Sequence, residues 1–141
     1  MSGDLQVEEA RAFAAFEAAV AAVPRERMEE AVLPDGWTVK DVLWHVAYWW
    51  RDGERTFLAI AAGTHTGFDD DEETDVANAR VLEESRSRSL QEVEAEFGAV
   101  RGSFLATFAP VAGDPTAAEL FRSETIEHYE EHLPAVRTLG A

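Results

Sequence analysis

Apolar residues recur at helical spacing along almost the whole chain, and no stretch alternates at the period of two that is typical of strands. Near the N-terminus, Phe13, Phe16 and Val20 follow one another at steps of three and four residues. This spacing predicts a first helix that begins at about Gly3. Pro24 should end it, because proline lacks the N–H group that would continue the helix.

A second helix should begin after Thr38, which can cap it. Asp41 then stands at the third helical position, where a carboxylate suits the helix dipole, and Trp37 can pack on Val42 across the first turn. The helical spacing continues to about Gly63, where we expect this helix to end.

Two further long helices are predicted in the second half of the chain. The sequence SLQE, residues 89–92, is a capping signal, and the apolar residues after it keep the spacing of a helix bundle until Pro110. The sequence GDPT, residues 113–116, places a proline in the first turn of a fourth helix. This helix should run to about Leu139.

Residues 64–88 separate the second and third helices; they are acidic at first and then weakly helical from about Glu72 to Ser87. Four long amphipathic helices predict an all-α fold, a four-helix bundle that forms a single domain over residues 1–141. A connection of this length can carry the chain back along the bundle and set the third helix parallel to the second. The predicted order is therefore up, down, down, up, with a short helix in the crossover.

The composition restricts the possible partners. The 141 residues include 28 acidic and 12 basic ones, and a formal net charge of −16 disfavours nucleic acid and anionic membranes as partners. Cysteine is absent, which excludes disulfides, thiolate metal sites and a thiol nucleophile within the chain. No apolar run is long enough to span a bilayer, and the acidic start is unlike a signal peptide. We therefore expect a cytoplasmic protein.

Two of the four histidines stand at matching depths in the predicted helices, and a third stands one turn away from one of them. His45 comes seven residues after Thr38, and His132 comes seven residues before Leu139, so each lies about 10 Å from a helix end. The two depths coincide if the second and fourth helices are antiparallel. His128 precedes His132 by four residues and should project from the same helix face.

Three convergent imidazoles would bind a borderline divalent cation, with zinc or nickel the best match, and would leave coordination positions open. An open position allows the metal to activate a bound water or a thiol, which this cysteine-free chain would take from a small molecule. The alternative is that His45 is a hydrogen-bonded core histidine and that the HxxxH pair arises by chance. His65 stands in a predicted loop and is expected to be solvated.

The stretch GWTVKDVLWHVAYWW resembles the second-helix motif of the DinB/YfiT-like superfamily, in which a histidine comes eight residues after a tryptophan, as His45 follows Trp37. HYEEH resembles the HxxxH motif of that family's last helix, and DVANARVLEE is similar to its crossover. The resemblance implies a bundle of up, down, down, up order with a divalent metal held by His45, His128 and His132. It also implies a relationship to enzymes that use mycothiol or bacillithiol, such as maleylpyruvate isomerase and thiol S-transferases.

Two features depart from the family pattern. The sequence has no C-terminal domain of the kind that maleylpyruvate isomerases carry, so we do not expect maleylpyruvate to be the substrate. Pro134 follows the last histidine, where it should kink the helix and adjust the aim of His132 toward the second helix. The alternative is a tolerated bend near a helix end.

Several other residues have two interpretations each. Glu124, one turn before His128, is a surface acid, a carboxylate that fixes a histidine tautomer, or a general base. Trp49, one turn after His45, is a core residue or part of the wall of a substrate pocket. Asn78 is expected to form a hydrogen bond that packs the crossover on a helix.

Two surface features also bear on partners. Trp44 or Trp50 can lie in a dimer face, which would make the protein a homodimer. The acidic run that contains Asp69 to Asp71 is a solvated loop or a weak cation site.

Two functions of different classes remain. The first is a metal-dependent enzyme, a thiol S-transferase or a hydrolase, that activates a small thiol or water against an electrophilic small-molecule substrate. The second is a non-catalytic bundle that binds a small molecule or acts as a dimeric interaction partner, with structural histidines.

Overall fold

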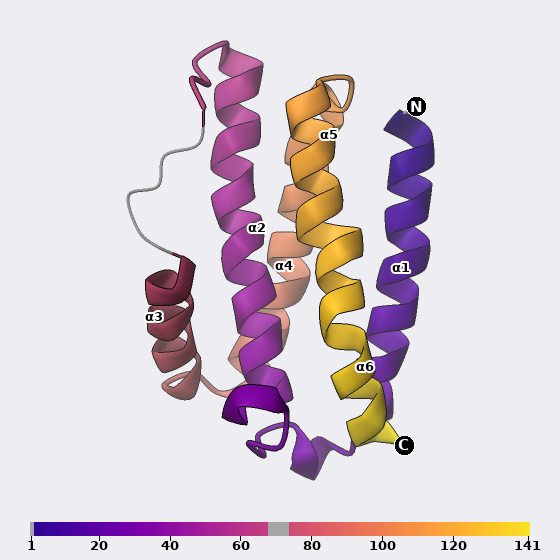
Figure 1. Cartoon of the computed structure of the whole chain (residues 1–141), viewed down its shortest axis with the longest axis vertical. Coiled ribbons are helices and arrows are strands. Elements are labelled where there is room, and N and C mark those ends of the chain that lie inside the picture. Colours follow the sequence, from indigo (N-terminus) through magenta and orange to yellow (C-terminus); the bar gives the residue numbers. More distant parts are fainter. Residues whose placement is uncertain (1, 68–73) are drawn as a thin grey trace.

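The computed structural model describes residues 2–67 and 74–141, and these residues form helices and no strand. The prediction of an all-α fold is therefore confirmed for this part of the chain. Long helices lie side by side, and one short helix packs on the outside of the second (Figure 1). In chain order the α-helices are α1 (Ser2–Ala22), α2 (Val39–Ala62), α3 (Thr74–Arg86), α4 (Leu90–Phe108), α5 (Pro115–Arg122) and α6 (His128–Gly140).

The start of α2 is held by the predicted capping box and by contacts with the crossover. The side chain of Thr38 accepts from the Asp41 N–H, and the side chain of Asp41 accepts from the Thr38 N–H, both at 2.9 Å. The other carboxylate oxygen of Asp41 accepts a 2.7 Å hydrogen bond from the Ser85 hydroxyl on α3. The end of α2 is set by Gly63, whose φ of 74° is in the left-handed region that favours glycine.

Contacts between α2 and α4 show that these two helices run in the same direction. Trp50 packs against Phe97 with ring centroids 5.0 Å apart, and Phe57 packs against Phe104 at 5.1 Å. Residue numbers therefore rise together along the pair. At Gly53, between these two contacts, an added Cβ atom would lie only 2.8 Å from a ring carbon of Phe104, so this glycine allows the close packing.

The last helix, which α5 and α6 form together, runs parallel to α1 and antiparallel to α2. Arg122 donates two hydrogen bonds to Glu8 near the start of α1, whereas Gly140 lies against Ala22 at its end. On the other side, the Trp50 indole donates to the main-chain carbonyl of Glu124 at 2.9 Å, and residues closer to the start of α2 contact α6. Because α2 and α6 run in opposite directions, His45 and His132 can lie at the same depth in the bundle, as the sequence predicted.

A buried network joins α1, α4 and α6 in the core. The Tyr129 hydroxyl donates to one carboxylate oxygen of Glu9 at 2.7 Å, and Arg101 donates to the other at 2.8 Å. Glu9 and Tyr129 are each only 1% exposed, so both oxygens of a buried carboxylate have partners. Burial, followed by the nearby Glu9 charge, raises the pKa of Tyr129. This network fixes the rotation of α6 next to His128.

The last helix is irregular at a position that the sequence did not indicate. Residues Ser123–Glu127 form a π turn that connects α5 to α6, while Pro134 lies inside α6 and the chain stays helical on both sides of it. The departure from α-geometry therefore precedes His128. That Pro134 adjusts the aim of His132 stays a prediction.

The tryptophans proposed for a dimer face are buried within the chain itself. Trp50 is fully buried in the core, and Trp44 is 5% exposed beneath the guanidinium groups of Arg51 and Arg88, which lie 5.1 and 5.0 Å from its ring. The suggestion that Trp44 or Trp50 lies in a dimer face was therefore wrong, and the homodimer itself stays a prediction.

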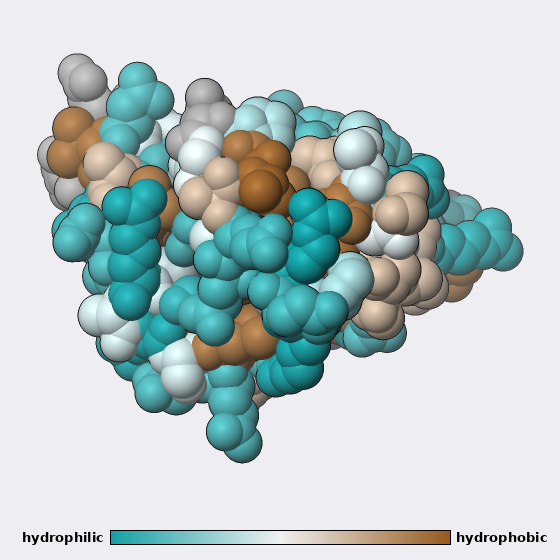
Figure 2. Space-filling model, turned by 90° about the horizontal axis from the view of Figure 1, so that it is seen from below, coloured by the Kyte–Doolittle hydropathy of each residue, from teal (hydrophilic) through white to brown (hydrophobic). Residues whose placement is uncertain are grey.

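The described surface offers no long apolar helix. None of the described helices is long and apolar enough to cross a membrane. On the end of the bundle shown in Figure 2, hydrophobic side chains form separate patches with hydrophilic side chains between them. The acidic run with Asp69 to Asp71 lies outside the described residues.

Candidate metal centre

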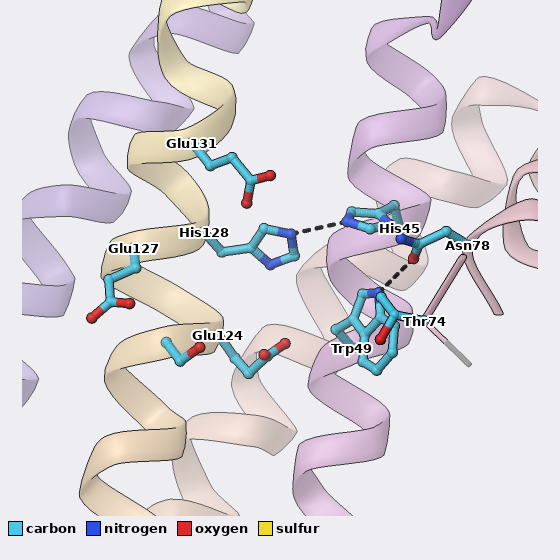
Figure 3. A pocket seen from close by; sticks show the side chains of 9 residues that line it. His45, Trp49, Thr74, Asn78, Glu124, Glu127, His128 and Glu131 are labelled. Carbon is cyan, nitrogen blue, oxygen red and sulfur yellow. Dashed lines mark hydrogen bonds between the residues drawn. The ribbon is translucent and has the colours of Figure 1, made fainter. Parts of the chain in front are cut away.

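Three histidines from two helices meet near one end of α2. His45 comes from α2, and His128 and His132 come from α6. One ring nitrogen from each residue lies within 4.8 Å of those of the other two. The Nε2 atoms of His45 and His128 are only 3.0 Å apart (Figure 3). The structure thus brings together the three residues that the sequence singled out.

The π turn and its contacts define the position of His128. The turn ends at Glu127, and the main-chain N–H of the next residue, His128, donates to the carbonyl of Thr125. The carbonyl of Glu124 accepts instead from the Trp50 indole on α2, at 2.9 Å. A hydrogen bond from another helix thus satisfies the main-chain carbonyl of Glu124 within the irregular turn. The same bond joins α2 to the last helix one turn before His128.

Burial keeps the three imidazoles neutral. His45 and His128 are 7% and 8% exposed, and His132 is partly exposed. Burial and then His132 lower the pKa of His45 to about 4, against a smaller opposite effect of Asn78. Burial and then the two other histidines lower the pKa of His128 to about 3. Burial also lowers the pKa of His132, and Glu131 opposes that shift. Near neutral pH all three rings therefore have the form that binds a metal.

The cluster fits a divalent cation in its donor atoms and spacing. The Nδ1 atoms of His45 and His128 and the Nε2 atom of His132 are buried without a hydrogen-bond partner. The 3.0 Å between the two facing Nε2 atoms is close to the roughly 3.3 Å that two zinc–nitrogen bonds in a tetrahedral site would set. Imidazole nitrogen is also a preferred ligand for zinc and nickel.

The chain matches the family Mycothiol maleylpyruvate isomerase N-terminal domain over residues 10–129. It belongs to this family. The matched region includes His45 and His128 and ends before His132. The predicted relationship to DinB-like domains is thereby confirmed. Neither a curated protein nor a solved structure shows a significant match to the chain.

In this member of the mycothiol maleylpyruvate isomerase N-terminal domain family, a cavity of about 350 Å³ adjoins the histidines. His45 and His128 line it, and His132 is not part of its wall. Trp49 lies on the α2 side of the cavity, one turn from His45, and its indole N–H donates to the Asn78 side chain at 3.0 Å (Figure 3). The remaining lining residues are Thr74, Ser123, Glu124, Glu127 and Glu131.

Asn78 and Trp49 lie where the sequence suggested, and each has a further contact with the site. The hydrogen bond of Asn78 packs α3 on α2, as expected, but the same residue also faces the cavity and influences the pKa of His45. Trp49 also lines a second cavity of about 890 Å³, which shares Thr74 and Glu124 with the first. His65 lies in the wall of this second cavity, away from the three clustered histidines.

Glu124 is a partly buried carboxyl group in the cavity wall. Burial, followed by the charges of Asp52 and Glu131, raises its pKa to about 7. Its Oε2 atom is buried without a hydrogen-bond partner. A carboxyl group with a pKa near neutrality can both accept and release a proton under ordinary conditions. This environment is not that of a surface acid, and the two other interpretations, a carboxylate that fixes a histidine tautomer and a general base, stay predictions.

The sequence missed three features of the site. Glu127 and Glu131 were not singled out, although their places beside His128 and His132 put them one residue from a candidate ligand. The π turn also gave no signal, and the residue that bonds to the Glu124 carbonyl within it, Trp50, is on another helix. The steps of three and four residues from Glu124 to Glu127 and from Glu127 to Glu131 were the signal that could have placed these side chains together.

Proposed function

We propose that the chain is a divalent-metal-dependent enzyme that activates a small thiol or a water molecule against an electrophilic small molecule. The observation that carries this proposal is the cluster of His45, His128 and His132, three neutral imidazoles at the edge of a cavity. The family name favours a thiol such as mycothiol over water. Zinc or nickel suits the ligand set best.

We also propose that residues 1–141 form one domain, a four-helix bundle of up, down, down, up order. The parallel contacts of α2 with α4 and of α1 with α6 support this order. The order matters for function because it sets α2 against α6, which supply the histidines.

A cation held by the three histidines would supply a Lewis acid that lowers the pKa of a thiol or water bound to it. His45 and His128 face the cavity, so a substrate there would lie on the open side of the cluster. Glu124 would accept the proton that the thiol or water releases, since its pKa is about 7. Trp49, one turn from His45 on α2, would exclude water from that side of the cavity and present an apolar ring to the substrate.

The larger cavity favours a second candidate function. Its volume of about 890 Å³ is in the range of ligand-binding pockets, so the chain could hold a small molecule without transforming it. In that case the histidines would have a structural role.

The experiment that separates the two functions uses protein purified without a histidine tag. Elemental analysis gives the metal content, and transfer of mycothiol to a chromogenic electrophile such as 1-chloro-2,4-dinitrobenzene gives the activity. We expect the activity to disappear on chelation and to return with zinc or nickel. Full activity in metal-free, folded protein would contradict the metal-dependent enzyme, and binding without turnover in either form would favour the second function.

A further inference from the structure

The Asn78 side chain is a hydrogen-bond acceptor beside His45. Its Oδ1 atom accepts a 3.0 Å hydrogen bond from the Trp49 indole, which can only donate, so this bond fixes the direction of the amide (Figure 3). Burial and then His132 lower the pKa of His45, and a hydrogen bond with the Asn78 side chain opposes them. Because only an acceptor favours the protonated ring, Asn78 presents its oxygen to His45.

The main-chain carbonyl of Glu124 has the equivalent position beside His128. In a regular α-helix it would accept from the main-chain N–H of His128, four residues further on. That N–H donates to Thr125 instead, and the Glu124 carbonyl accepts from the Trp50 indole at 2.9 Å. A carbonyl oxygen can accept a second hydrogen bond. Burial and then the other two histidines lower the pKa of His128, and the Glu124 main chain opposes them, as an acceptor beside the ring would.

The second nitrogen of each facing ring is the atom that these acceptors can satisfy. The Nε2 atoms of His45 and His128 lie 3.0 Å apart, which leaves Nδ1 as the other nitrogen of each ring. Both Nδ1 atoms are buried, and among the described residues neither has a partner at close hydrogen-bond geometry. A buried N–H group needs an acceptor, so a proton on Nδ1 depends on an oxygen nearby.

We propose that two positioning groups keep the protons of the facing histidines on Nδ1. The Asn78 oxygen accepts the Nδ1–H of His45. The Glu124 carbonyl accepts the Nδ1–H of His128. Both rings then turn the lone pairs of their Nε2 atoms to one cation, and the two adjacent indoles act through the acceptors that they hold. This inference rests on the proposed function for the cation, although it concerns proton positions within the chain itself.

The proton positions can be measured in metal-free protein by long-range ¹H–¹⁵N NMR of the histidine side chains at pH 8. There the two rings can share one N–H···N bond, so one carries its proton on Nε2 and the other on Nδ1. The two acceptors then compete for the Nδ1–H form. We expect Asn78→Ala to shift His45 toward the Nε2–H form by about 2–10-fold, the effect of one hydrogen bond. Asn78→Asp, which keeps an acceptor oxygen, should shift His45 toward Nδ1–H.

Zinc affinity, measured by competition with a chelator, gives a second readout. Asn78→Ala should bind zinc about 10–100-fold more weakly, because it loses a group that orients a ligand, and Asn78→Asp should restore the affinity. Trp49→Phe keeps an aromatic ring but frees the amide to rotate, so its loss should be smaller, about 2–10-fold. In the zinc-loaded wild type, His45 and His128 should both bind through Nε2 and carry their protons on Nδ1.

Ser85→Ala is the matched control for a purely structural role of Asn78. The Ser85 hydroxyl on α3 donates a 2.7 Å hydrogen bond to Asp41 on α2, so this variant also removes one bond between these two helices. Thermal unfolding of metal-free protein should show that Ser85→Ala and Asn78→Ala are both less stable than the wild type. Ser85→Ala should nevertheless keep the wild-type zinc affinity and histidine tautomers.

Zinc bound through Nδ1 of either ring would overturn the inference. So would a His45 tautomer balance that is the same in the wild type, Asn78→Ala and Asn78→Asp, or an equal loss of zinc affinity in Asn78→Ala and Ser85→Ala. A protein that takes up no zinc, but whose His45 tautomer follows the residue at position 78, would contradict the metal-dependent enzyme alone. Zinc-dependent thiol transfer with an unresponsive His45 tautomer would contradict this inference alone.

Discussion

The Nε2 atoms of His45 and His128 lie 3.0 Å apart, although the two residues are separated by 83 positions in the sequence. Two protonated imidazolium groups would repel each other at this distance, and burial lowers the pKa of both rings. Neutral rings held this close can share one N–H···N hydrogen bond, or both can turn their lone pairs to a cation. The two rings are therefore close enough to bind the same ion.

Replacing His128 with Ala should abolish metal binding. The wild type should hold about one divalent ion per chain, because three ring nitrogens within 4.8 Å of one another form a preorganised site. Elemental analysis of tag-free protein measures the content, and circular dichroism checks that the variant is helical. His65→Ala, which changes a histidine outside the cluster, is the matched control and should retain the ion. Full metal content in His128→Ala would remove this residue from the site.

Zinc affinity should persist to a lower pH than that of a cluster of unperturbed histidines, because the pKa of each of the three rings is lowered. A proton competes with the metal only when the pH approaches the pKa of a ligand, and these values are about 4 for His45 and about 3 for His128. An unperturbed histidine cluster would lose affinity from about pH 6.5 downward, which is what the sequence alone predicts. Competition titration with a chelator of known pH dependence measures the profile.

The lowered pKa values of the histidines also affect the stability of the fold at acid pH. A lowered histidine pKa means that the unfolded chain binds more protons than the folded chain between the folded values and 6.5, so stability falls as the pH falls through that range. Glu124 acts in the opposite direction, because its pKa is raised to about 7 and its contribution is lost as the pH rises. A steep fall in zinc affinity already between pH 7 and 6 would contradict the lowered values.

Gly53→Ala should destabilise the bundle by about 1–3 kcal/mol, because the new methyl group would press on the buried ring of Phe104. Gly102→Ala on α4 is a matched control, since its added Cβ would meet nothing within 4 Å. That variant should be neutral or up to about 1 kcal/mol more stable, through helix propensity. Urea unfolding followed by circular dichroism gives both values. Equal stabilities would show that α2 and α4 are not packed as closely as described.

The local signals in the sequence predicted the frame of the site. The capping box of Thr38 and Asp41 and the glycine at position 63 set the ends of α2 within a residue or two, because capping depends on neighbours in the chain. That His128 and His132 project from the same helix face likewise follows from their spacing of four residues and from helix geometry alone. These features do not require knowledge of the other helices.

The electrostatics of the site and its irregular turn could not be read from local signals. The raised pKa of Glu124 depends on its burial and on Asp52, which is on a different helix. The π turn at Ser123–Glu127 contains the carbonyl of Glu124, which accepts a hydrogen bond from Trp50, again on α2. Trp44 and Trp50 were proposed for a surface because helix two is apolar nearly all round, and only the packing shows that both are covered.

Glu124→Gln should lower the rate of thiol transfer by about 10²–10⁴-fold while leaving the metal content unchanged. If Glu124 is the general base, the wild-type kcat/KM should rise with pH as this carboxyl ionises, at or somewhat below pH 7, because a bound cation stabilises the ionised form. The variant should lose this rise. Glu119→Gln, an exposed glutamate outside the cavity, is the control. An unchanged pH profile in Glu124→Gln would assign the proton transfer to another group.

Removal of the metal should abolish turnover and leave the fold intact. The aromatic core that contains Phe57, Phe104 and Phe108 involves none of the three histidines, so the bundle has a core that does not depend on the ion. Loss of the metal should therefore cost only the stability that ligand binding adds, seen as a modest fall in Tm that depends on the free zinc concentration. Circular dichroism of chelated protein should show the same helicity and cooperative unfolding. A zinc-dependent collapse of helicity would instead show that the cation has a structural role, as in small domains that fold only with metal.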